Sequence, residues 1–374
     1  MDFEIETKRF SQAARIISNV ATREAFPNEA AHVLIRAMEN EIIFTATDRI
    51  FSIRLSLKDA AISSPGEISF YVPTLISLCS RLIGETVIVK AAPNSTQSSF
   101  SSGGFKGSMN LISCSDLKNI DIPMIDASLT LSSSELSKSL GQVYFAAADE
   151  KSASSMSLCN IKVSCKNDCL EFIACDARRL AKRKLPCIQE NIPEFDVSLS
   201  ARYANKIRIL LKEIPEEDIS IGVNGDKLIL CGRLWSIMCL LSQYKLPSEH
   251  QNMIPSRKNT EVLLNRYKFL TALRRSSCLG LEDIDCPRTV SMSFEKNRLK
   301  LSASNEVGKA LEYITAKPKG PPLEIKFSAN HMEQGLDAID CEQIILSANS
   351  SREPLLIEAG TPDIDFNYVL MPKV

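Results

Sequence analysis

The side chains that could carry out catalysis are few and lie far apart in this sequence. Its histidines are His32, His250 and His331, which long stretches of chain separate. The Gly-x-Ser-x-Gly pattern of a serine nucleophile and the His-Glu-x-x-His pattern of a zinc protease are both absent from the sequence. We therefore expect no nucleophile, no general base, no cofactor and no enzymatic activity.

Two aspartates, Asp48 and Asp176, end similar segments that read Phe-Thr-Ala-Thr-Asp and Phe-Ile-Ala-Cys-Asp. Paired carboxylates can share acid–base chemistry. Each of these aspartates, however, follows a strand-like run of its own, in a different part of the chain. Short carboxylate side chains commonly hydrogen-bond the backbone of the turn that follows them, so we interpret both as turn-capping residues.

Cysteine is the other chemically versatile residue, and the sequence contains 12 of them. The closest group is Cys159, Cys165, Cys169 and Cys175, whose gaps lack the Cys-x-x-Cys form that zinc sites favour. Their alternating neighbours place several of them as small hydrophobic residues in strands, so we expect no metal. The chain begins Met-Asp-Phe-Glu, without the basic and apolar regions of a leader, and we expect a reduced, cytoplasmic protein.

The composition is that of an ordinary globular protein, with 44% hydrophobic and 24% charged residues among 374. Because the net charge is −1, a nucleic-acid partner would have to meet a local basic surface. No apolar run approaches the roughly 18 residues of a membrane span. The longest, residues 234–241, is interrupted by Ser236 and predicts a buried strand.

The segment that ends at Asp176 belongs to a long internal repeat. A looser copy, Leu-Ser-Ala-Ser-Asn, ends at Asn305, and Asp48, Asp176 and Asn305 are 128 and 129 residues apart. A second marker, a strand end at Val72, Leu199 and Phe327, gives 127 and 128. A period of this length indicates three domain-sized repeats and excludes a solenoid. We predict domains at residues 1–126, 127–254 and 255–374.

Each repeat is predicted to contain two halves, and each half a helix followed by strands. Apolar spacing predicts opening helices near residues 10–17, with Ser11 at the start, 136–143 and 267–273. Second helices are expected at 73–82, 201–211 and 329–339, and strands at 41–48, 68–72, 170–176, 195–199, 299–303 and 323–327. The glycine-rich segment 103–108 lacks phosphate-loop spacing and predicts a hairpin. The fold class is therefore α+β, with helices on antiparallel sheets.

Three segments carry a resemblance to a known family. They are Ala-Cys-Asp-Ala-Arg-Arg-Leu at residues 174–180, Tyr-Lys-Leu-Pro at 244–247 continuing to Met-Ile-Pro at 253–255, and Tyr-Val-Leu-Met-Pro at 368–372. Together, and in this order within a threefold repeat, they resemble the bacterial β sliding clamp, the processivity subunit of DNA polymerase III. The resemblance covers the whole chain. Departures are Ala177 and Arg178 in place of the family's usual Gly and His, and an end at Lys373-Val374.

The resemblance implies a non-catalytic ring. Two subunits would form a head-to-tail homodimer around duplex DNA, a separate loader would open it, and the replicative polymerase and other partners would bind through short peptides. Six domains of about 125 residues leave a central hole roughly 30 Å wide, which clears a duplex of roughly 20 Å. We expect cytoplasmic localisation, no cofactor and a role in DNA replication.

Three groups of site residues follow from the resemblance. The DNA-facing residues would be Arg15, Arg23, Arg81, Lys138, Arg202, Lys206, Arg208, Arg274 and Arg275. The dimer interface would pack Met109 and Leu111 against Cys278 and Leu279. The partner-peptide pocket would comprise Leu158, Cys175, Arg178, Arg179, Leu180, Pro247, Met253, Pro354, Val369, Leu370, Met371 and Pro372.

Two alternatives stay open from the sequence. An enzyme of unrecognised type could place a site between domains, and a repeat-built scaffold could bind proteins alone. Each basic residue could also be part of an ordinary solvated helix face, each interface residue part of a domain core, and the last strand a simple completion of its sheet. Retention on circular but not linear DNA distinguishes a ring from the alternatives.

Overall fold

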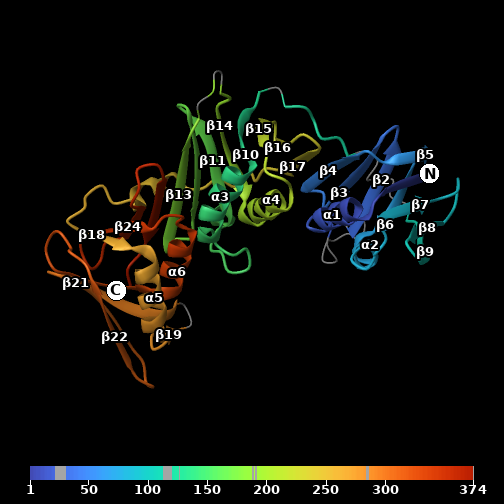
Figure 1. Cartoon of the computed structure of the whole chain (residues 1–374). Coiled ribbons are helices and arrows are strands. Elements are labelled where there is room, and N and C mark those ends of the chain that lie inside the picture. The colour runs from blue at the N-terminus through green and yellow to red at the C-terminus, as the bar shows by residue number, and fades with distance from the viewer. Residues whose placement is uncertain are drawn as a thin grey trace. The chain divides into compact units, whose positions relative to one another are not determined.

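A computed structural model describes residues 1–21, 31–112, 120–125, 127–187, 189, 192–283 and 286–373 (Figure 1). The chain divides into two compact units, which are described one at a time. Unit 1 comprises Met1–Ser137, Asn191–Pro193 and Lys206–Leu241, and unit 2 comprises Lys138–Glu190, Glu194–Asn205 and Ser242–Val374. Among the residues that the structure covers, no helix is both long and apolar enough to cross a bilayer.

The same order of elements occurs three times along the chain: a strand and a helix, a run of strands, a second helix and three closing strands. The first set is β1 (Asp2–Glu6), α1 (Thr7–Ser18), β2 (His32–Met38), β3 (Glu41–Thr47), β4 (Phe51–Lys58), β5 (Ala61–Ser64), β6 (Gly66–Tyr71), α2 (Val72–Cys79), β7 (Thr86–Lys90), β8 (Gln97–Ser102) and β9 (Phe105–Asn110).

The second set contains three short 3₁₀ helices in addition. It is β10 (Leu129–Ser132), α3 (Ser133–Val143), η3 (Tyr144–Ala146), η4 (Met156–Cys159), β11 (Asn160–Lys166), β12 (Cys169–Cys175), β13 (Arg179–Pro186), β14 (Phe195–Ser200), α4 (Ala201–Glu213), β15 (Asp218–Asn224), β16 (Lys227–Cys231), β17 (Trp235–Leu240) and η5 (Ser248–Met253).

The third set has the same order of strands and helices as the first. It is β18 (Thr260–Asn265), α5 (Arg266–Ser277), β19 (Leu281–Asp283), β20 (Cys286–Glu295), β21 (Arg298–Ser304), β22 (Lys309–Thr315), β23 (Leu323–Ser328), α6 (Ala329–Ala338), β24 (Gln343–Ala348), β25 (Leu355–Ala359) and β26 (Asp365–Leu370). All pairings between these strands are antiparallel, so the predicted α+β class is confirmed.

Unit 1 contains a five-stranded sheet, β5-β1-β7-β8-β9, and an eight-stranded sheet, β10-β15-β16-β17-β4-β3-β2-β6. The second sheet joins strands from two successive repeats, because β17 pairs with β4 along Trp235–Leu55 to Cys239–Phe51. Helix α1 packs its apolar side against the strands of its own repeat. The ring centroids of Phe10 on α1 and Phe44 on β3 are 5.5 Å apart. The joint between repeats is thus a continuous sheet.

Unit 2 follows the same plan. Its eight-stranded sheet runs β14-β11-β12-β13-β26-β25-β24-β18, and β26 pairs with β13 across the joint between the second and third repeats. The remaining sheet is β19-β20-β21-β22, with β23 also paired to β20. Helix α6 approaches β26 closely at Gly335, where a Cβ would stand 2.3 Å from the Tyr368 ring. A side chain at position 335 would therefore displace Tyr368.

Most of the predicted elements are confirmed, with shifts at their ends. Helix α1 begins at Thr7, four residues before Ser11, whose hydroxyl donates to the Cys79 carbonyl at 3.1 Å instead of capping the helix. Helix α2 ends at Cys79, short of the predicted residue 82. The glycine-rich segment forms the β8–β9 hairpin turn, as predicted.

Candidate functional sites

A compact group of apolar side chains lies in unit 2 where four strands meet. We call it the apolar cluster; it consists of the buried Ile173, Cys175, Leu180, Leu246, Leu356 and Val369 with the partly buried Leu158, Met253 and Ile254. Cys175, Leu180, Val369 and Leu356 stand opposite one another on β12, β13, β26 and β25, in one row across the sheet. Side chains in such a row share one face, which explains why residues far apart in sequence form one surface.

The border of the apolar cluster comes from η4 and from the loop that precedes η5. Asn160 is buried, and its amide nitrogen donates to the carbonyls of Met156 and Tyr244, at 3.0 Å each. These two bonds fix η4, which carries Leu158, beside the loop that carries Leu246. The side chains of Met156 and Tyr244 are themselves exposed. The row of buried residues is therefore flanked by apolar groups that solvent reaches.

The predicted pocket residues divide into two sets. Leu158, Cys175, Leu180, Met253 and Val369 meet in the apolar cluster, and sequence reasoning missed Ile173, Leu246, Ile254 and Leu356. Apart from that cluster, Pro247 and Arg178 are exposed and Pro354, Met371 and Pro372 are half-buried.

The chain end is fixed beside the apolar cluster. The Met371 amide donates to the Arg178 carbonyl at 2.8 Å, and the Lys373 amide to the Lys326 carbonyl at 2.8 Å. These bonds hold the last residues next to the turn between β12 and β13.

Arg179 and Leu370 lie on the other face of the sheet, outside the apolar cluster. They stand opposite each other in register, one residue along from Leu180 and Val369, and strand side chains alternate between faces. The Arg179 guanidinium donates to Asp176 at 2.8 Å and to Gln334 of α6, and it lies 5.6 Å from the Phe145 ring centroid. Arg179 therefore stabilises the turn and α6 on the face of the sheet opposite the apolar cluster.

Two titratable groups, Tyr368 and His331, lie beside Arg179 on this face of the sheet. The Tyr368 hydroxyl donates to the His331 carbonyl at 2.8 Å, and burial raises the pKa of Tyr368. Burial, with the Arg179 charge, lowers the pKa of His331 to about 4. The imidazole is thus neutral at physiological pH.

The basic residues predicted to face DNA are mostly paired with carboxylates. Lys206 lies 2.7 Å from Asp48, and the two side chains are 15% and 9% exposed, so Lys206 is part of the core of unit 1. The other described pairs are Arg15 with Glu213, Lys138 with Asp340, Arg274 with Glu333 and Asp337, and Arg275 with Glu312. Each pair reduces the field that a phosphate would meet.

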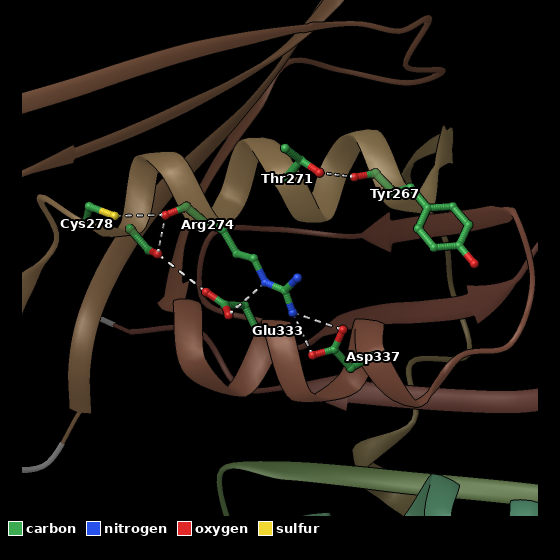
Figure 2. A network of polar contacts seen from close by, with 7 residues as sticks. Tyr267, Thr271, Arg274, Cys278, Glu333 and Asp337 are labelled. Carbon is green, nitrogen blue, oxygen red and sulfur yellow. Dashed lines mark hydrogen bonds and ion pairs between the residues drawn. The ribbon is translucent and has the colours of Figure 1, made fainter.

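Figure 2 shows the arrangement on α5 and α6. The Arg274 guanidinium reaches across to Glu333 at 3.4 Å and Asp337 at 2.9 Å, while Tyr267 and Thr271 precede it on α5. Directly after α2 and on α4 the contacts are neutral: Arg81 donates to the Ser77 carbonyl at 2.6 Å, and Arg202 lies 5.8 Å from the Tyr203 ring centroid.

Two further residues of the DNA-facing set remain. The carbonyl of Arg208 accepts from the Ser137 hydroxyl at 3.0 Å, and Arg23 lies outside the described residues.

The predicted interface residues lie at two sheet edges. Met109 is on β9, the last strand of the five-stranded sheet in unit 1, and the Leu111 amide donates to Thr96 at 2.8 Å. Cys278 and Leu279 follow α5 in unit 2, and Leu279 lies beside Gly308, directly before the edge strand β22. Each pair therefore adjoins an edge that its own unit leaves open.

Several of the described cysteines are buried and behave as small apolar residues, among them Cys159, Cys165 and Cys175. Burial raises the pKa of Cys165 to about 12 and that of Cys175 to about 11, so both thiols stay protonated at neutral pH. Within the described ranges, no cluster of His, Cys, Asp and Glu could hold a metal ion.

Comparison with known proteins agrees with this geometry. Residues 251–374 match the family of the DNA polymerase III beta subunit, C-terminal domain. A curated "Beta sliding clamp" from Synechococcus elongatus is 26% identical over 350 residues, covering 91% of each chain, and one from Chlamydia muridarum is 25% identical over 386 residues, covering 100% of this chain and 98% of that one.

Solved structures give the same result for the whole chain. The DNA polymerase III beta chain of Streptococcus pneumoniae has a TM-score of 0.91 at 21% identity, and the DNA polymerase sliding clamp of Bacillus subtilis 0.90 at 20%; each covers 100% of this chain and 99% of the other. The fold is therefore that of a sliding clamp. Residues 251–374 match the C-terminal domain of the DNA polymerase III beta subunit, and curated beta sliding clamps are similar to this chain over nearly its whole length.

Proposed function

We propose that this protein is a non-catalytic sliding clamp that encircles duplex DNA and tethers the replicative polymerase and other DNA-processing proteins to it. Its domains would be residues 1–126, 127–254 and 255–374, and it would act in the cytoplasm without a cofactor. The support comes from the whole-chain clamp fold and from the way successive repeats join.

The observation that carries the proposal is a pair of half-sheets without a partner. Each eight-stranded sheet combines a closing half of one repeat, such as β10-β15-β16-β17, with an opening half of the preceding repeat, such as β4-β3-β2-β6. The strands left over are the closing half β1-β7-β8-β9 of the first repeat and the opening half β22-β21-β20-β23 of the third.

A second copy of the chain would complete both half-sheets. Strand β9 of one copy would pair with β22 of the other, and a twofold axis would repeat the contact, so the ring would close with two identical joints. Unpaired strand edges otherwise invite aggregation. Exposed apolar residues beside these edges favour the same contact, namely Phe105, Val307, Leu311 and Tyr313.

The partner site would be the apolar cluster together with its exposed border. Two large apolar side chains of a peptide, placed against the partly buried Leu158, Met253 and Ile254, would gain roughly 3 to 6 kcal/mol before the cost of association, so isolated peptides should bind at about micromolar strength. The neutral contacts of Arg81 and Arg202 leave their charges available for weak, sequence-independent attraction to phosphate.

Topological retention tests the proposal directly. The protein is loaded onto nicked circular duplex with a clamp loader and ATP, and the complex is separated by gel filtration. A ring remains with the circle and is lost when a restriction enzyme linearises the DNA. Equal retention on both forms would show binding to the DNA surface and would contradict encirclement.

A further inference from the structure

Buried rows of side chains cross both internal joints in the same register. In each repeat the row starts four residues before the first helix. The row in unit 1 runs Leu129, Ile221, Leu230, Ile237, Ile53, Ala46, Val33 and Phe70, and the row in unit 2 runs Val262, Leu346, Ile357, Tyr368, Ala181, Ala174, Ile161 and Leu199.

The unpaired half-sheets contain the two halves of a third such row. One half is Phe3, Val89, Phe100 and Gly107, and the other is Ala310, Ala303, Val290 and Phe327. Continuity of the row places Gly107 of β9 opposite Ala310 of β22 in a second copy. In that register Met109 falls opposite Gly308, next to Leu279. The contact that the sequence predicted between Met109 and Leu279 fits this register.

A turn next to each joint has the same hydrogen bonds in all three repeats. One side-chain oxygen of Asp48 accepts from the amides two and three residues later, at 3.2 and 2.8 Å. Asp176 does so at 3.0 and 3.1 Å, and Asn305 at 2.9 Å for both. The second polar atom of each side chain takes no part in these two bonds.

At the two internal joints this second atom makes a charged contact. In unit 1 the second oxygen of Asp48 binds Lys206, the sixth residue of α4. In unit 2 the second oxygen of Asp176 accepts from the Arg179 guanidinium of the same turn. That guanidinium also donates across the joint to the side chain of Gln334, the sixth residue of α6.

The third turn differs in chemistry. Asn305 carries a neutral amide in place of the carboxylate, and the sixth residue of α2 is Ser77. Ser77 is exposed, and its hydroxyl oxygen accepts from Arg81, two residues beyond the end of α2, at 2.9 Å.

We propose that, in the dimer, Asn305 faces Ser77 of a second copy, so that the joint between subunits lacks the charged side-chain contact that crosses each joint within the chain. This inference rests on the proposed dimer. The physical consequence is local: breaking the joint in unit 1 separates the Asp48–Lys206 ion pair, and breaking the joint in unit 2 separates the Arg179 guanidinium from Gln334, whereas the joint between subunits has only neutral side chains at these positions. The substitutions Asn305→Asp and Ser77→Lys would supply the missing pair.

The register is tested by disulfide trapping. It places Ser108 opposite Lys309, and opposed residues in antiparallel strands lie close enough for a disulfide. S108C/K309C is expected to give a covalent dimer on a non-reducing gel after mild oxidation, while S108C/L311C, shifted by two residues, and the parent chain remain monomeric on that gel. Efficient trapping of the shifted pair in place of the matched pair would overturn the register.

The ionic contact is tested by a double-mutant cycle on the dimer dissociation constant. N305D, S77K and the double variant are made in an Arg81→Gln background, which removes the neighbouring cation from the comparison. The double variant is expected to lower the dissociation constant about three- to fivefold beyond the product of the single effects. Additive effects in an intact dimer would overturn the inference, whereas a parent chain that forms no dimer would overturn the proposed function.

Discussion

At the scale of single residues, side chains along β13 and β26 alternate between the apolar cluster on one face of the sheet and supporting contacts on the other. Leu180 and Val369 face the apolar cluster, while Arg179 and Leu370 face α6 and the buried polar groups. A substitution in the first pair changes the packing of the apolar cluster, and one in the second changes the opposite face of the sheet, which supports that cluster. The residues that solvent reaches are the better probes of binding, because Leu180 is fully buried.

Met253→Ala should weaken binding of a Gln-Leu-x-Leu-Phe-type peptide about tenfold, since a partly buried side chain loses on the order of 1 to 2 kcal/mol of contact with the bound apolar residue. Isothermal titration of the peptide against wild type and variant measures the effect. Leu263→Ala is the matched control, because Leu263 is an exposed apolar residue of β18 outside the apolar cluster. Equal losses in both variants would place the peptide elsewhere.

His331 should make stability depend on pH. Its pKa is about 4 in the folded protein, below the ordinary 6.5, because burial disfavours the charged ring. Between pH 4 and pH 6.5 the unfolded chain binds a proton at His331 that the folded protein does not bind. The contribution of His331 to stability is therefore complete above pH 6.5 and is lost as the pH falls toward 4. After allowance for partial exposure, the loss is about 1 to 2 kcal/mol.

Denaturant unfolding at pH 7, 6 and 5 measures this contribution. The stability of His331→Gln should fall less over that range than the stability of wild type. A variant with the same slope as wild type would show that other groups cause the pH dependence.

At the scale of elements, the proposed dimer depends on two strand edges and the proposed DNA contact on two helices. Leu279→Glu should give a folded monomer, because it places a charge where β22 would receive β9 of a second copy. Analytical ultracentrifugation reports the dimer, and circular dichroism reports the fold. Leu263→Glu serves as control and should remain dimeric. A persistent Leu279→Glu dimer would contradict the proposed interface.

Removing the carboxylates beside Arg274 should strengthen DNA binding. In Glu333→Gln/Asp337→Asn the guanidinium is free to contact phosphate, so low-salt affinity should rise and the slope of log K against log salt should steepen by about 1. The control is Glu295→Gln, which frees Arg298 on the β20–β21 hairpin. If both variants change the slope equally, α5 and α6 do not face DNA.

The same elements show how far the sequence could predict the site. Cys175, Leu180 and Val369 were named in advance because the resemblance marks their positions within the motif segments. Leu356 was missed because no sequence motif marks it. It joins the row only because β25 pairs with β26 and places it opposite Val369. Asp48 was predicted as a turn cap, and its bonds to the amides of residues 50 and 51 confirm this. Its ion pair with Lys206 joins residues 158 positions apart, a distance at which spacing carries no information.

At the scale of the whole molecule, the net charge of −1 agrees with the pairing of basic residues inside the chain. Five of the nine predicted DNA-facing residues have carboxylate partners in the described structure. Attraction to DNA would then be weak, and retention would depend on closure of the ring more than on affinity. This balance suits a protein that must slide.

The sheets shared between repeats also govern how the chain can fold during synthesis. The β4 edge of the first repeat meets its partner when β17 has left the ribosome, since Phe51 pairs with Cys239. At about 5 to 20 residues per second, the nascent edge waits roughly 10 to 40 s, and β13 then waits in the same way for β26 at the end of the chain. Each newly made repeat therefore emerges with an unprotected strand, which makes the nascent chain a substrate for chaperones until its successor has been translated.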